Sequence, residues 1–154
     1  MLSISHAATG AFIAAKIGNP VLAVPLILAS HYLEDAVPHW DAGTGLSKGL
    51  KTPGAAFRDE ILDLALAGLL VLALFPMHPL SPITYSLFPL SPLWGAFFGL
   101  LPDFLEAPRN FWKTEPRWLR PLNKFHGRFH HSIPNVWAGL APQVLLLGLI
   151  WVLR

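Results

Sequence analysis

Histidine and aspartate residues recur in this sequence at the spacing of one helical turn. His31 and Asp35 are four residues apart, and so are His126 and His130. Side chains at this spacing lie on one face of a helix and can bind the same metal ion. An intrahelical hydrogen bond would explain the first pair alone, and a hydrated interfacial cluster would explain the second. Both pairs in one short chain favour a metal site.

Additional candidate ligands lie near these pairs. Asp103 follows Pro102, which is expected to kink its helix, and His6 falls in the first turn of the first predicted helix. The sequence contains no cysteine, so the ligands must be imidazole and carboxylate groups, which suit zinc, manganese or ferrous iron. We favour zinc because it is frequent in hydrolytic sites. The candidate metal ligands are His6, His31, Asp35, Asp103, His126 and His130. They would allow two ions, or one ion with carboxylates that orient its histidines, and the sequence leaves both open.

The composition indicates that a membrane protein positions these residues. Hydrophobic residues make up 53% of the 154 residues and charged residues only 13%, against about 25% charged residues in a typical soluble domain. With 15 prolines and 12 glycines, the helices should be short and often broken. The net charge of +2 is too small to indicate nucleic-acid binding. We therefore predict one all-α integral membrane domain over residues 1–154, with about five short, proline-broken helices.

Apolar runs and helix start signals give the approximate bounds of these helices. The helices are expected at about 4–17, 21–35, 59–75, 92–106 and 135–153. The last has no formal charge and is the clearest candidate for a membrane span. Segment 1–17 lacks a basic leader, which favours a retained helix over a cleaved signal peptide. The connections are a polar loop at 36–57, an apolar loop at 76–91 and a basic, aromatic segment at 107–133 that suits the membrane interface.

Threading these helices alternately through a bilayer predicts the orientation of the chain. The N-terminus, the segments 36–57 and 107–133 and the helix ends beside them then share one face, together with nine of the 11 lysines and arginines. The positive-inside rule makes this face cytoplasmic and places the C-terminus outside. All of the seven histidines except His78 fall at the same face. Because ionisable groups in a bilayer are costly unless paired, hydrated or metal-bound, we expect a functional site there.

Four short elements carry most of these residues. They are SH at 5–6, SHYLED at 30–35, LLPD at 100–103 and HGRFHHS at 126–132. Together they resemble motifs of the predicted membrane-bound metal-dependent hydrolases, small multi-helix membrane proteins of bacteria and archaea. The family pattern combines an early His with S-H-x-x-x-D, L-P-D-x-D-H and H-R-G-x-T-H-S. The resemblance implies a prokaryotic plasma-membrane protein that uses a metal to hydrolyse a phosphoester or similar bond, such as one in a lipid.

The resemblance also implies roles for residues around the metal ligands. His39, Asp41 or His131 would act as general base or acid. Arg109 and Arg128 would bind a phosphate, because guanidinium groups bind such oxygens bidentately. A site at headgroup depth beside basic and tryptophan residues suits an anionic lipid. The implied partners are therefore the bilayer and an anionic lipid or another phosphoester substrate.

Two other functions stay open on the sequence. The protein could be a non-enzymatic metal-binding or ion-transporting membrane protein, in which the same cluster handles an ion in passage. A conduit should continue polar groups across the membrane, whereas the opposite half of the helices offers only Gln143, Lys16 and a few hydroxyls. The protein could also be a membrane scaffold subunit whose histidines lie at an interface, and it would then bind no metal. The sequence does not predict the substrate or the oligomeric state.

Overall fold

The computed structural model describes residues 1–76 and 90–154, which form a bundle of α-helices. Its helices are α1 (Ser3–Ile17), α2 (Pro20–Ala36), α3 (Pro53–Leu74), α4 (Pro92–Trp112), α5 (Arg120–His126) and α6 (Val136–Leu153). The prediction of an all-helical fold is confirmed for this part of the chain, with six helices where about five were predicted. The additional helix, α5, lies in the basic, aromatic segment. The predicted loop at 76–91, with His78, falls almost wholly outside the described residues.

Most helices begin at a polar residue that caps their first turn. The side chains of Asn19, Thr52, Ser91 and Asn135 each accept a hydrogen bond from a main-chain N–H two or three residues further on. This is the usual N-cap arrangement, and it satisfies a donor that has no partner within the helix. A proline follows the cap of α2, α3 and α4, where its missing N–H leaves no bond unmade.

Two helices extend further than predicted. α3 begins at Pro53 and not near residue 59, because Thr52 caps it and Pro53 suits its first position. α4 continues through Pro102 and past residue 106 to Trp112. Each proline removes its own N–H donor and crowds the carbonyl of the preceding turn, and close packing against α1 at Gly95 and Gly99 supports the turns of α4 before Pro102. Asp103 therefore lies inside a helix that continues for more than two further turns.

The main chains of α1 and α4 are in contact where the two helices cross. A Cβ atom added to Gly10 would lie 2.2 Å from the carbonyl oxygen of Gly95, and one added to Gly99 would lie 2.4 Å from that of His6. Small residues at such crossings let helix backbones approach closely. This contact places His6 of α1 directly beside Gly99 of α4.

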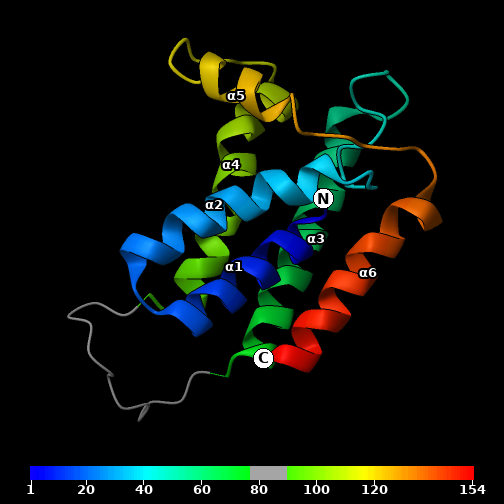
Figure 1. Cartoon of the computed structure of the whole chain (residues 1–154). Coiled ribbons are helices and arrows are strands. Elements are labelled where there is room, and N and C mark those ends of the chain that lie inside the picture. Colours follow the sequence, from blue (N-terminus) through cyan, green and yellow to red (C-terminus); the bar gives the residue numbers. More distant parts are fainter. Residues whose placement is uncertain (77–89) are drawn as a thin grey trace.

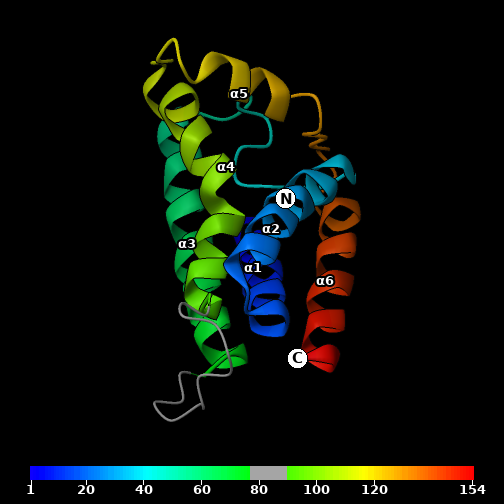
Figure 2. The same ribbon diagram turned by 60° about the vertical axis from the view of Figure 1, so that its left-hand side comes forward.

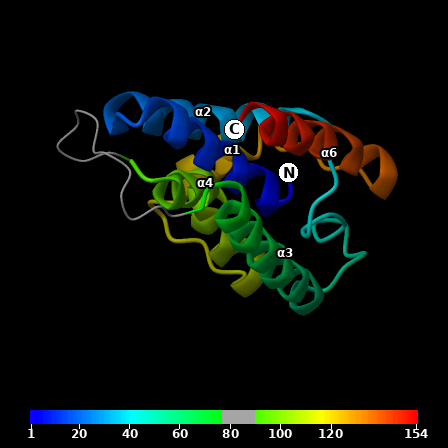
Figure 3. The same cartoon turned by 90° about the horizontal axis from the view of Figure 1, so that it is seen from below.

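α1 lies at the centre of the bundle. Figure 3 shows it between α2 and α6 on one side and α3 and α4 on the other. Its Ala7 and Ala11 pack with Ala67 and Val71 of α3 and with Ala96 of α4. Because these side chains are short, the surrounding helices can approach α1 closely.

Segments with polar residues gather at one end of the bundle. Figures 1 and 2 show the N-terminus, α5 and the loop between α2 and α3 at the same end, with the C-terminus at the other. We call the end that carries Met1, α5 and residues 37–52 the polar end. Among the described helices, α6 alone is long and apolar enough to cross a membrane, with a mean hydropathy of 2.0 over its 18 residues.

Candidate metal centre

One carboxylate lies in the middle of the polar end. Asp35, in the last turn of α2, is fully buried. Its Oδ2 atom lies 2.7 Å from Nε2 of His126, 3.3 Å from Nδ1 of His130 and 3.5 Å from Nε2 of His31. The pair His31 and Asp35 on α2 therefore meets the pair His126 and His130 from the end of α5 and the turn after it.

The other oxygen of Asp35 faces α1 and the loop after α2. Oδ1 lies 3.2 Å from Nε2 of His6 and 3.8 Å from Nε2 of His39. The main-chain nitrogen of Met1 also contacts this oxygen and lies 3.0 Å from Nε2 of His6. Histidines from α1, α2, α5 and two loops thus surround a single buried carboxylate.

Asp103 of α4 completes a set of four side chains that could bind one ion. Its Oδ1 lies 3.7 Å from Nε2 of His31 and 3.8 Å from Nε2 of His126. One ligand atom from each of Asp103, His31, His126 and Asp35 lies within 4.8 Å of all the others. We call these four residues the Asp103 group. A second set with the same property, the His39 group, consists of Asp35, His39 and His130. Nitrogen and oxygen donors of this kind could hold a divalent metal ion.

Main-chain hydrogen bonds hold the loop after α2 against the loop after α5. The N–H of His39 donates to the carbonyl of His131 at 3.1 Å, and the N–H of Ile133 donates to the carbonyl of His39 at 2.7 Å. The N–H of His131 donates to the carbonyl of Asp35 at 3.1 Å. This short parallel pairing, centred on His39 and Ser132, brings the two loops to Asp35.

Main-chain carbonyls accept hydrogen bonds from Nδ1 of two histidines and so fix the orientation of their rings. Nδ1 of His31 donates to the carbonyl of Gly99, and Nδ1 of His39 donates to the carbonyl of Val37, each at 2.8 Å. A neutral imidazole with its proton on Nδ1 presents a free lone pair on Nε2. Metal-binding histidines usually have such a second hydrogen bond, which sets the tautomer and the ring orientation. Nε2 of both rings therefore points into the cluster and can bind a cation once it carries no proton.

Two glutamates that were not predicted as site residues lie near Nδ1 of other histidines. Oε2 of Glu34 lies 2.9 Å from Nδ1 of His6, and Oε2 of Glu106 lies 3.8 Å from Nδ1 of His126. Both glutamates are buried. A signal was available for Glu106, because it follows Asp103 by three residues and shares its helix face. The candidate centre thus contains more carboxylates than the sequence predicted.

Asp41 joins the two loop histidines. Its Oδ2 lies 3.0 Å from Nε2 of His39 and 3.1 Å from Nε2 of His130. Burial disfavours the charged form of His130, but the carboxylates of Asp35 and Asp41 outweigh it and raise its pKa to about 10. Burial also works against ionisation of Asp41, yet hydrogen bonds with His130 and His39 hold its pKa well below the usual range. Without a metal ion, His130 is therefore an imidazolium between two carboxylates at neutral pH.

The structure does not bring three of the predicted site residues into this cluster. His131 is exposed, and its Nδ1 donates to the carbonyl of Phe129 at 2.6 Å. Arg128 is also exposed. Arg109 is partly exposed and pairs with Glu106, so it reaches the cluster only through that glutamate. Of the predicted catalytic residues, His39 and Asp41 are the two that lie beside Asp35.

A groove adjoins the centre between α2, α4 and α5. It has a volume of about 160 Å³. Its walls include Leu28, Tyr32, Leu101, Leu105, Leu122 and His126. We call it the His126 groove. Because His126 also belongs to the Asp103 group, an apolar space leads directly to a candidate metal ligand.

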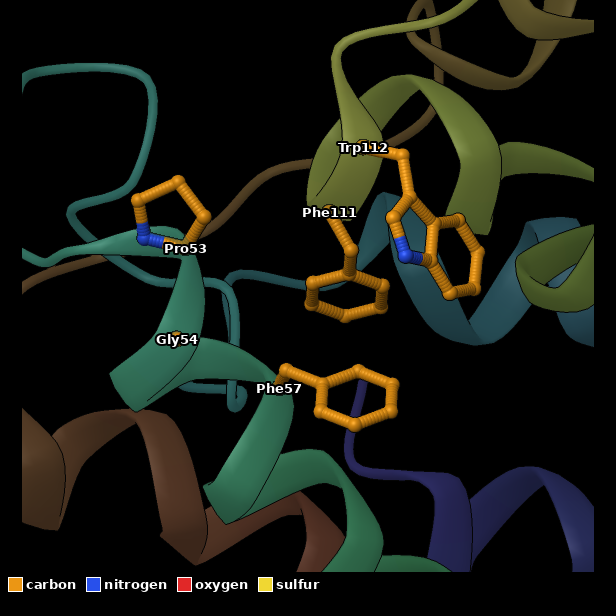
Figure 4. A pocket seen from close by; sticks show the side chains of 5 residues that line it. All are labelled: Pro53, Gly54, Phe57, Phe111 and Trp112. Carbon is orange, nitrogen blue, oxygen red and sulfur yellow. The ribbon is translucent and has the colours of Figure 1, made fainter.

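A separate hollow of about 200 Å³ lies where α3 begins and α4 ends. Figure 4 shows its lining of Pro53, Gly54, Phe57, Phe111 and Trp112. The ring centroids of Phe57 and Phe111 are 5.3 Å apart. Three of the five lining residues are aromatic and none is a candidate metal ligand, so this hollow has no evident part in chemistry at the centre.

No protein-family model, no curated protein and no solved structure matches this chain. The motif resemblance is also partial. S-H-x-x-x-D precedes L-P-D here, FLE follows Asp103 where the family has x-D-H, and HGR replaces HRG. The geometry of the His and Asp residues is therefore the main indication of function.

Proposed function

We propose that this protein is a membrane-embedded, metal-dependent hydrolase that cleaves a phosphoester of an amphiphilic substrate at its polar end. The observation that carries the proposal is the convergence of buried imidazole and carboxylate groups on Asp35. Burying so many polar groups is expensive unless they are paired or coordinate a metal. Ionisable residues gathered in this way within an apolar protein are expected to serve a function.

The donor set fits a divalent cation such as zinc, manganese or ferrous iron. Nε2 of His31 lies 3.3 Å from Nε2 of His126, so two nitrogens that both carry lone pairs in suitable tautomers face each other. A bound divalent cation satisfies such lone pairs, polarises a phosphoryl oxygen and acidifies a coordinated water. Zinc remains the first choice, because its sites are commonly built from histidine and carboxylate ligands.

The chain's own residues can orient the substrate and move a proton. Asp41 contacts both His39 and His130, so it can hold a proton on either ring and help His39 to act as general acid or base. Asp103 and His130 have side chains that are 26% and 31% exposed, whereas His31 and Asp35 are fully buried. Substrate would therefore reach the centre between Asp103 and His130. Arg109, beside Glu106, offers its guanidinium to a phosphate.

Large apolar side chains on the bundle surface support a membrane location. The exposed fraction is 84% for Trp137 and 74% for Leu145 of α6, 77% for Val21 of α2 and 66% for Leu69 of α3. Apolar surface on several sides of a monomer favours contact with lipid or with other proteins. We propose that lipid covers it, with the polar end at the cytoplasmic face. A C-terminal reporter that fluoresces only in the cytoplasm should then stay dark.

The His126 groove supports a substrate with an apolar tail. Its leucine-rich wall ends at His126, so a hydrocarbon chain in the groove would leave its headgroup beside the metal ligands. The segment after α4 supplies basic residues at the same end, which attract anionic headgroups. A lipid phosphoester combines both features.

Another reading is a polar core that binds no metal. Its specific support is that a cationic group already faces Asp35, because Asp35 and Asp41 hold His130 as an imidazolium. Such a core would suit a scaffold subunit. Metal content separates it from both the enzyme and a non-enzymatic metal-binding or transport protein.

The test uses the full chain purified in detergent without chelators. Metal content is measured together with phosphate release from phosphatidic acid in mixed micelles and from a soluble aryl phosphate. Wild type should contain bound metal and prefer the lipid substrate, and Asp103→Asn should lose activity by at least about 100-fold. Asp59→Asn is the matched control, because Asp59 pairs with Lys51 and Arg58 away from the cluster. Absence of metal from the wild type would support the polar core, and metal without hydrolysis would support a non-enzymatic role.

A further inference from the structure

We propose that the centre holds two metal ions, which share the carboxylate of Asp35. The inference rests on the proposed metal-dependent function and goes beyond it in the number of ions. The Asp103 group and the His39 group each bring their ligand atoms within 4.8 Å of one another, and Asp35 is the one residue they have in common. A carboxylate has two oxygens, so a single aspartate can serve two ions at once.

The two oxygens of Asp35 face different histidines. Oδ2 is near His31 and His126 of the Asp103 group, at 3.5 and 2.7 Å. Oδ1 is 3.8 Å from His39 of the other group. His130 lies 3.3 Å from Oδ2 and has its other nitrogen beside Asp41. Asp35 is thus flanked by both groups and belongs to neither alone.

Each group contains a histidine whose Nδ1 is hydrogen-bonded to a main-chain carbonyl, which orients Nε2 for metal binding. Gly99 accepts the Nδ1 proton of His31 in the Asp103 group, and Val37 accepts that of His39 in the His39 group. These hydrogen bonds are independent of the distances that define the groups. They leave Nε2 of His39 facing Oδ2 of Asp41 at 3.0 Å. Two acceptors at that distance require a proton or a cation between or beside them.

The negative charge at the centre also exceeds what one divalent ion would offset. Carboxylates within reach of the histidines are Asp35, Asp41, Asp103, Glu34 and Glu106. Glu106 is already paired with Arg109, and the other four still carry more charge than one divalent ion. Buried carboxylates need a nearby positive charge to stay ionised. Two divalent ions would supply that charge while leaving the imidazoles neutral, as metal ligation requires.

A centre with two metal ions indicates which kind of bond the substrate contains. Paired divalent ions about 3.5–4 Å apart are typical of enzymes that cleave phosphoesters by in-line displacement. The inference therefore favours a phosphoester over a carboxylic ester as the bond that is cleaved. It also gives His39 and His130 the role of ligands, in place of the acid–base role that the sequence suggested for His39.

The experiment measures zinc per chain. The full chain in detergent is stripped with chelator, dialysed and titrated with zinc alone, and bound zinc is counted by mass spectrometry and calorimetry. Wild type should bind two ions. His31→Ala and His39→Ala should each bind one, and His131→Ala, the matched surface histidine, should bind two. One zinc in the wild type would overturn the proposal, as would a His39→Ala variant that binds as many ions as the wild type.

Manganese gives a readout that does not depend on counting. Two Mn²⁺ ions joined by one carboxylate are magnetically coupled, and the electron paramagnetic resonance spectrum of wild type should show this coupling. His39→Ala should show the spectrum of an isolated ion while keeping the helix content of the wild type by circular dichroism. An uncoupled spectrum in fully loaded wild type would refute the shared carboxylate. A protein with one zinc that still releases phosphate refutes the second ion alone, whereas two zincs without hydrolysis refute only the proposed enzyme activity.

Discussion

Replacing Gly99 by alanine tests whether the contact between α1 and α4 positions the candidate metal centre. A Cβ atom at residue 99 would lie 2.4 Å from the carbonyl oxygen of His6 and 3.1 Å from its carbonyl carbon. Ordinary van der Waals contact begins near 3.4 Å. The two main chains would therefore have to separate by about 1 Å in an interior that is close-packed. Main-chain atoms cannot turn aside as the end of a flexible side chain would.

Overpacking of this kind costs about 1–3 kcal/mol, and each kcal/mol lowers the Tm of a chain of this length by about 2–4 °C. We expect Gly99→Ala to melt several degrees below the wild type in the same detergent. It should also bind zinc more weakly, because Gly99 accepts the hydrogen bond from His31 and the contact at residue 99 holds His6 near Asp35. Thermal melts and zinc titrations on the same preparations measure both effects.

Gly148→Ala in α6 is the matched control, because a Cβ atom there would have no heavy atom within 4 Å. Alanine favours a helix over glycine by about 1 kcal/mol at most, so this variant should be at least as stable as the wild type. Equal melting of Gly99→Ala and Gly148→Ala would show that α1 and α4 do not approach as closely as described. The position of His6 in the cluster would then be wrong as well.

Gln143, the proposed metal binding and His130 give three further predictions. Gln143 of α6 accepts from the N–H of Leu2 at 2.8 Å and donates to the carbonyl of Trp40 at 2.7 Å. Gln143→Leu leaves these partly buried groups unpaired, which should cost about 1 kcal/mol for each group in thermal melts; an unchanged Tm would show that Gln143 does not anchor the loop. Chelation should lower the Tm of the wild type and added zinc should restore it, since a ligand at 100 times its Kd stabilises by about 2.7 kcal/mol; no shift on chelation would argue against a folded-state metal. In the metal-free protein, Asp35 and Asp41 raise the pKa of His130 from 6.5 to about 10. The resulting stability is complete below the lower pKa and is lost as the pH rises through the higher one, so the Tm difference between wild type and His130→Ala should shrink from pH 6 to pH 10. A difference that is constant over this range would refute the charged state of His130.

Helical periodicity and the alternating direction of successive helices account for the predictions that agree with the structure. Helices were predicted to begin near residues 92 and 135, and the structure begins α4 at Pro92 and α6 at Val136. The spacing of His31 and Asp35 placed them on one face of α2. Threading successive helices in alternating directions placed His6 and Asp103 at the same end as that pair. The structure brings His6 to Asp35 and Asp103 to His31. These inferences needed no knowledge of how each helix is rotated about its axis.

The paths of the loops and the continuation of α4 past Pro102 could not be predicted from the sequence. His130 and His131 are adjacent, yet His130 contacts Asp35 while His131 is exposed. The difference arises because the main chain of His131 pairs with Asp35 and His39, which turns its side chain outward, and no local pattern predicts that pairing. α4 continues past Pro102 because α1 packs against it, a tertiary effect that overrides helix propensity.

The donors that meet at Asp35 come from widely separated parts of the chain, from His6 in α1 to His130 after α5. The full set of side chains can therefore come together only after the ribosome has released most of the protein and the helices have docked. In the proposed metalloenzyme, metal loading would be a late event that follows helix docking and cannot guide it. On that proposal, cells starved of the ion should accumulate a folded but inactive apoprotein, which a later supply of metal would activate without new synthesis.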